Sequence, residues 1–160
     1  MDTYQWLLLL HILAAFCFLS GIVVAGTLHG LAMRRDKPSD IALLLGMVRP
    51  MVVLIGIGSI GSLVFGIWLT QKDPNGIKLT DGWVIAAIVL WFVSGALSGP
   101  AGKKIRHARE LAEKLAHEGD QPSTELHAAV ADRAALVLNY VSALAVIAIL
   151  VLMVFKPGAG

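Results

Sequence analysis

Charged residues are scarce in this 160-residue sequence: Asp, Glu, Lys and Arg make up 15% of it, whereas hydrophobic residues make up 57%. The mean hydropathy is +0.76. A soluble domain of this length needs a more polar surface, so the composition excludes that class and indicates an integral membrane protein.

Cysteine and short catalytic motifs are also lacking. Cys17 is the only cysteine, which excludes an intrachain disulfide and leaves a small buried side chain as its expected role. No Cys/His metal spacing, nucleotide-binding glycine loop or nucleophile and base arrangement is present. The sequence therefore does not decide whether the chain is an enzyme.

Long apolar runs are what the sequence has in abundance. A hydrocarbon core of roughly 30 Å needs about 20 apolar residues per helix. Stretches of this kind predict an all-α, integral membrane four-helix bundle in a single domain of residues 1–160, with spans at about 6–28, 48–71, 83–100 and 134–156. Because Gly99 and Pro100 follow the third apolar run, we expect that helix to bend or break there.

The connection between the third and fourth spans, residues 103–133, predicts a solvated helical hairpin. Opposite charges four residues apart from Lys103 to Glu118 favour a helix, which Gly119 to Pro122 then end. Ser123 or Thr124 can cap a new helix, and we expect it to continue unbroken into the fourth span. The turn signal Asp73-Pro74-Asn75-Gly76 predicts that the second and third helices are neighbours.

Basic residues are distributed unevenly between the two sides of these spans. Ten lie in the connections between helices one and two and between helices three and four, and three lie on the other side. Under the positive-inside rule, both termini are extracytoplasmic, and we expect a multi-pass protein of the bacterial inner membrane. Topology accounts for the net charge of +2, so no nucleic-acid partner is expected.

Small residues recur every four positions in the second span, at Gly58, Ser62 and Gly66. A face of this kind lets two helices approach closely in lipid. It predicts close packing within the bundle, with a cofactor pressed against the glycine face as the alternative.

His11 lies inside the first apolar run, where ionisable side chains are rare and mark functional sites. His29 follows 18 residues later on the same stripe of the helix, about 27 Å away along the axis, so the two cannot share a ligand. The residues between them on this stripe are mostly small: Ala14, Ala15, Phe18, Ile22 and Ala25. This pattern suits a haem with His11 as its metal ligand, and it also suits ordinary helix packing.

Met153 is the other conventional axial ligand expected near the depth of His11. A five-coordinate haem, a His11 and Met153 pair, and a ligand supplied across a dimer interface all remain open.

A second polar cluster is expected around His29, with Arg49, Asp132 and Arg133 nearby. His29 and Arg49 could contact an anionic group such as a haem propionate, a headgroup or a quinone. Interhelical ion pairing at the membrane surface is the simpler interpretation. The remaining histidines, on the hairpin, are expected to be surface residues: His107, His117 and His127.

The segment from Trp6 through His11, with Gly21 and His29 later in the same helix, resembles the first helix of a superfamily of small bacterial membrane proteins. That superfamily includes HemJ-type protoporphyrinogen oxidases, copper-resistance D-type proteins and a family of predicted integral membrane proteins of unknown function. The last is most similar in length, helix count and charged hairpin.

For the oxidases, the resemblance implies an intramembrane histidine that supports haem or porphyrin binding, which corresponds to His11. Those enzymes also use a lysine in a later helix, and no apolar run of this chain contains one. The methionines do not cluster as a copper site would: Met33, Met47, Met51 and Met153.

Two functions therefore stand as hypotheses. The first is a membrane redox protein that binds b-type haem or a porphyrin through His11. The second is a noncatalytic accessory or structural subunit that packs in the lipid bilayer against a larger membrane complex or a copy of itself. For a third, passage of a small solute or metal, the sequence contains no polar path.

Overall fold

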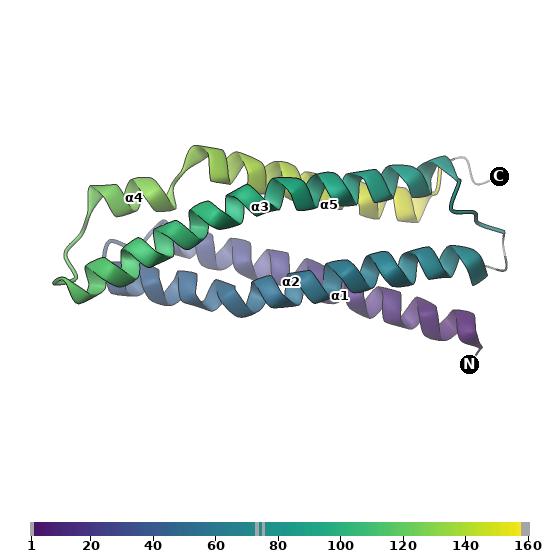
Figure 1. Cartoon of the computed structure of the whole chain (residues 1–160), viewed down its shortest axis with the longest axis horizontal. Helices are drawn as coiled ribbons and strands as arrows, with labels where there is room; N and C mark the ends of the chain where they lie inside the picture. Colours follow the sequence, from purple (N-terminus) through teal and green to yellow (C-terminus); the bar gives the residue numbers. More distant parts are fainter. Residues whose placement is uncertain (1, 73, 75, 158–160) are drawn as a thin grey trace.

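The computed structural model describes residues 2–72, 74 and 76–157, so Asp73 and Asn75 of the expected turn lie outside the described residues. The described chain is all helical: α1 (Thr3–Ala32), α2 (Pro38–Lys72), α3 (Gly82–His117), α4 (Thr124–Val130) and α5 (Arg133–Phe155). Four stretches are long and apolar enough to cross a membrane: α1, α2, α3, and α4 together with α5 (Figure 1). The predicted all-α, four-helix membrane bundle is confirmed.

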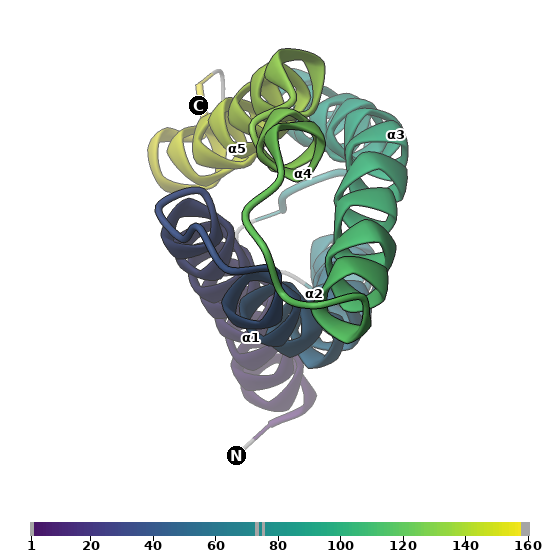
Figure 2. The same ribbon diagram turned by 90° about the vertical axis from the view of Figure 1, so that its left-hand side faces the viewer.

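The long helices form two pairs. Helix α1 packs on α2, and α3 packs on α5; α2 also contacts α3, and α4 contacts α3 (Figures 1 and 2). Both chain ends lie at one end of the bundle, here called the terminal end, and α4 lies at the other, here called the hairpin end (Figure 1). The prediction that the second and third helices are neighbours is confirmed.

Glycines allow close packing along the contact surface between α1 and α2, here called the seam. A Cβ added to Gly58 would lie 2.5 Å from the Phe18 nitrogen and 2.7 Å from the Ala14 carbonyl oxygen, both in the α1 backbone. One added to Gly21 would lie 2.7 Å from Cγ1 of Ile55. The predicted close packing of this face is therefore confirmed, and its partner is α1.

The seam between α3 and α5 is joined by hydroxyl groups. The Ser94 and Ser142 Oγ atoms lie 2.7 Å apart, and both residues are buried. The Ser98 Oγ lies 2.9 Å from the Ser142 Oγ and donates to the Ser94 carbonyl at 2.8 Å. Such hydrogen bonds between helices supply attraction in lipid, where the hydrophobic effect between helices is absent.

The most deeply buried apolar cluster lies toward the hairpin end, where α1, α2, α3 and α4 meet. Its members are Ala32, Ile41, Leu45, Ala108, Ala112, Leu126 and Val130. The apolar stretches of the spans bury only 6% to 22% of their residues. Large apolar side chains on their outer faces, such as Phe16 and Val154, are exposed and suit contact with lipid.

Helix α3 does not break at Gly99-Pro100, so of the expected bend or break the break is wrong, and the bend stays a prediction. Contacts on both sides of Pro100 hold the helix in one piece. On the N-terminal side of Pro100, Ser94 and Ser98 form hydrogen bonds with Ser142 of α5. On its C-terminal side, Ala101 and Ala108 are buried. These tertiary contacts outweigh the one backbone hydrogen bond that Pro100 removes.

The loop after α3 caps two helices. Gly119 and Asp120 both have positive φ, at 122° and 53°, and the Asp120 amide donates to the Leu115 carbonyl at 3.1 Å, which ends α3. The Asp120 carboxylate then accepts from the Ser39 amide at 2.8 Å and from the Ser39 hydroxyl at 2.7 Å. Because Ser39 lies in the first turn of α2, Asp120 satisfies a free donor of that helix from a distant part of the chain.

These two hydrogen bonds, the one from the Ser39 hydroxyl foremost, lower the pKa of the Asp120 carboxyl below its usual value, with help from the charge of Lys37. A carboxyl with a lowered native pKa contributes stability above its unfolded pKa of about 3.9, and that stability is lost as the pH falls through the lowered value.

The substitution Asp120→Asn keeps one oxygen acceptor and tolerates positive φ, but it removes the charge and replaces the second acceptor oxygen with an NH2 donor. We expect the variant to be less stable than the wild type near neutral pH and equally stable in acid. Thermal unfolding in detergent, followed by circular dichroism over this pH range, measures the difference. A stability gap that stays constant down to acid pH would contradict this role for the carboxylate.

The glycine seam makes a second prediction. Gly58→Ala should destabilise the bundle by about 1 to 3 kcal/mol, because the new methyl group overlaps the α1 backbone. Gly56→Ala is the matched control, since a Cβ there meets nothing within 4 Å, and better helix propensity should leave it neutral or slightly stabilised. Equal unfolding temperatures for the two variants would show that the seam is not tightly packed.

Candidate functional site

His11 is held by α2 across the seam. Its Nδ1 atom lies 2.9 Å from the backbone carbonyl oxygen of Ser62. A carbonyl oxygen can only accept, so Nδ1 carries the proton and donates it. In the neutral imidazole, Nε2 is then the unprotonated nitrogen, and it has no hydrogen-bond partner among the described residues.

Gly66 makes this contact sterically feasible. A Cβ at Gly66 would lie 3.1 Å from Cε1 and 3.3 Å from Nδ1 of His11. The ring therefore rests on the bare backbone of α2, one turn from the carbonyl that it bonds. Ser62 and Gly66 belong to the small-residue face identified in the sequence, and the structure assigns part of that face to seating an imidazole.

The small-residue stripe of α1 is partly covered by α2, at Ala14 and Phe18. Ala14, Phe18 and Gly21 contact α2 directly at Gly58, Gly61 and Ile55. The covered part of the stripe is therefore not a bed for a flat macrocycle. The imidazole does fit the role of a metal ligand, because metal-binding histidines typically donate their second ring N–H to a carbonyl or carboxylate, as His11 does to Ser62.

Met153 lies in the last turn of α5 and is half-buried. Helix α5 packs on α3, whereas the helix of His11 packs on α2. The pairing of Met153 with His11 therefore stays a prediction.

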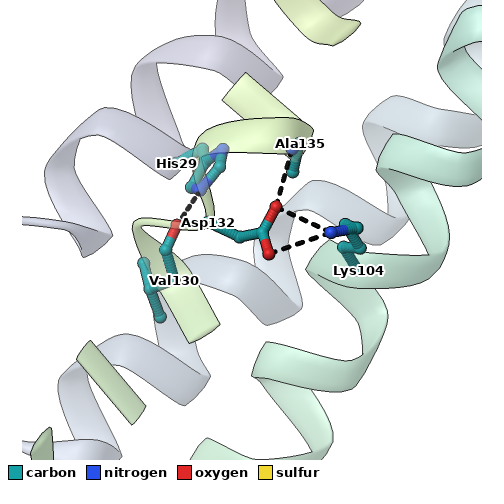
Figure 3. Close-up of polar contacts among 5 residues, drawn as sticks. All are labelled: His29, Lys104, Val130, Asp132 and Ala135. Atoms are coloured by element: carbon teal, nitrogen blue, oxygen red, sulfur yellow. Dashed lines mark hydrogen bonds and ion pairs between the residues drawn. The ribbon is translucent and has the colours of Figure 1, made fainter. Parts of the chain in front are cut away.

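His29 is buried, with 6% of its surface exposed, and its Nε2 donates to the Val130 carbonyl at 2.9 Å (Figure 3). Val130 is the last residue of α4, and its carbonyl is free because α4 and α5 are separated at Ala131 and Asp132. The predicted unbroken fourth helix is therefore wrong, although the predicted cap at Ser123 is confirmed. His29 satisfies the carbonyl that this break releases.

Asp132 begins α5 on the other side of the break. Its carboxylate accepts from the Ala135 amide at 2.8 Å, and both oxygens accept from Lys104 Nζ at 2.9 Å (Figure 3). The break between α4 and α5, here called the joint, is thus fixed by α1 through His29 and by α3 through Lys104. A helix cap and an ion pair replace the backbone hydrogen bonds that a continuous helix would form here.

The polar cluster expected around His29 is arranged differently in the structure. Asp132 pairs with Lys104, and Arg49 and Arg133 are exposed. His29 and Arg49 are not brought together by a hydrogen bond or ion pair among the described residues. His29 is engaged in holding α4, which gives it a structural task in this fold.

The hairpin histidines lie at the surface or close to it. His107 and His117 are exposed, and His127 Nε2 lies 3.6 Å from an Asp36 carboxylate oxygen. Within the described residues, no group of three or more His, Cys, Asp or Glu side chains is arranged to hold a metal ion.

Sequence reasoning did not identify the Lys104 ion pair or the serine contacts between α3 and α5. Ser94 and Ser98 are one turn apart in an apolar helix, which is a detectable signal for an interhelical hydrogen bond. Lys104 carried no such signal, because its partner depends on where the fourth helix breaks.

Two substitutions at Asp132 separate the functions of its carboxylate. Asp132→Asn keeps a cap for α5 but loses the ion pair with Lys104, which is partly exposed and therefore contributes little. Asp132→Ala loses both the cap and the ion pair. We expect a graded loss of unfolding temperature, with Ala more affected than Asn. If Ala were as stable as the wild type, the joint would not depend on Asp132.

The chain was compared with known proteins. No curated protein and no solved structure matches it. Residues 5–157, almost the whole chain, match the family described as predicted integral membrane protein (DUF2269). That description agrees with the four long apolar helices of the bundle. The chain belongs to this family of predicted integral membrane proteins, DUF2269.

Proposed function

We propose that this membrane protein binds a b-type haem or a related porphyrin through Nε2 of His11 and serves a redox role in the membrane. The observation that carries the proposal is the 2.9 Å hydrogen bond from His11 Nδ1 to the Ser62 carbonyl. It fixes the tautomer whose free nitrogen is Nε2, and it orients the ring before any ligand binds.

Three residues have separate roles in the proposed ligand site. Ser62 keeps the proton on Nδ1, Gly66 gives the ring room, and His11 offers the lone pair. A haem held in this way would supply one-electron chemistry, while the protein sets the basicity of its ligand and the polarity around it.

The resemblance of the first helix to HemJ-type oxidases supports a porphyrin as the ligand class. Because no lysine lies in the apolar runs, the proposal is binding and electron transfer and does not include porphyrinogen oxidation.

The absorption spectrum of the purified full chain, with and without reductant, tests this proposal. We expect a Soret band that is lost in His11→Ala and retained in the control His107→Ala, since His107 is exposed on the hairpin. Gly66→Ala should shift the band, because the new Cβ would press on the imidazole. Circular dichroism and gel filtration confirm that each variant is folded.

Colourless wild-type protein from haem-replete cells would reject haem binding. With a folded but less stable His11→Ala variant, that result would favour the structural subunit, in which the hydrogen bond between His11 and Ser62 only joins α1 to α2.

We further propose that the terminal end of the bundle faces outward from a bacterial inner membrane and that the hairpin end is cytoplasmic. The excess of Lys and Arg at the hairpin end supports this orientation. In a Cys17→Ala background, a membrane-impermeant maleimide should label Thr80→Cys in intact spheroplasts and Glu113→Cys only after lysis. Labelling in the reverse order would contradict the proposed topology.

A further inference from the structure

A shallow notch lies beside the joint, between α3 and the end of α4. It is lined by Lys103, Lys104, His107, Ala129 and Asp132 and has a volume of about 240 Å³. Figure 3 shows two of its walls, Lys104 and Asp132, held together by their ion pair. The notch is separate from the His11 site, which lies in the opposite half of α1 from the hairpin end.

The notch carries an unbalanced positive charge. Lys104 and Asp132 neutralise each other at 2.9 Å. Lys103 lies beside them, and His107 lies one turn further along α3; both are exposed, and neither forms an ion pair with a described residue. Arg133, next to Asp132, is exposed as well. An anion in the notch would thus meet free donors from Lys103 and His107.

The depth of the notch relative to the bilayer indicates which kind of anion it meets. Lys103 follows the apolar part of α3, and Arg133 precedes the apolar part of α5, so the notch lies where both helices leave the apolar layer. Lipid phosphates lie at this level of a bilayer.

We propose that this notch binds the phosphate headgroup of an anionic phospholipid, with Lys103 and His107 as its contacts. The ion pair between Lys104 and Asp132 positions one wall. Anionic lipid bound here contacts α3, α4 and the start of α5 together, so it stabilises the joint. The inference does not depend on a cofactor at His11.

Titration of the purified full chain in neutral detergent with phosphatidylglycerol, phosphatidylcholine or inorganic phosphate tests the inference. Bound lipid is measured by native mass spectrometry and its effect by the unfolding temperature. We expect phosphatidylglycerol to bind and raise the unfolding temperature, with little effect of the other two. Lys103→Gln should weaken phosphatidylglycerol binding about fivefold, since a lysine near an anionic lipid surface is worth about 1 kcal/mol. The double variant Lys103→Gln with His107→Gln should weaken it further.

Arg106→Gln is the matched control, because Arg106 is an exposed cation on the same helix that does not line the notch. Its binding of phosphatidylglycerol should match that of the wild type. An equal loss in Arg106→Gln would show diffuse attraction without a site, and equal binding of phosphatidylcholine would show that the charge is irrelevant. Stabilisation by inorganic phosphate alone, equal to that by the lipid, would identify a free-anion site. Each of these results would overturn the inference.

Discussion

Contact between the backbones of α1 and α2 at Gly58 is the constraint on which the candidate site depends. Because Gly58 has no Cβ, Ala14 and Phe18 of α1 lie directly against it. The same approach brings the His11 ring to hydrogen-bonding distance of the Ser62 carbonyl and over Gly66. A wider separation of the two helices would leave an intramembrane imidazole without its partner, which is costly in lipid.

The two histidines of α1 form the same kind of hydrogen bond in two different settings. Each donates a ring N–H to a backbone carbonyl of another helix, His11 to Ser62 and His29 to Val130. The Ser62 carbonyl lies inside a continuous helix, whereas the Val130 carbonyl is free because its helix ends there. His29 therefore repairs a gap in the fold, and His11 adds a contact to a helix that is complete without it. That difference favours His11 as the residue available for a ligand.

The sequence predicted most of the architecture because the membrane imposes simple rules on it. The long apolar runs gave the four helices, and Gly58, Ser62 and Gly66 gave the face on which α1 packs. Two helix boundaries were not predictable. Pro100 normally ends a helix, but contacts on both sides carry α3 through it. No glycine or proline marks the break at Ala131 and Asp132. The helix breaks there because His29 binds the Val130 carbonyl and Lys104 binds the Asp132 carboxylate. The ion pair of Lys104 and the exact partner of His11 depend on these tertiary contacts, which local patterns do not contain.

The protonation of the His11 ring is the most direct measure of the central claim, which is that Ser62 fixes Nδ1–H and leaves Nε2 free to bind a ligand. Nitrogen-15 NMR of the full chain in bilayers, with the signal assigned through a His11→Gln variant, distinguishes the two ring nitrogens. The structure predicts a protonated Nδ1 and an unprotonated Nε2 before ligand is added, and a change at Nε2 when haem is added. A proton on Nε2 with a bare Nδ1 would contradict both the hydrogen bond to Ser62 and the proposed ligand site.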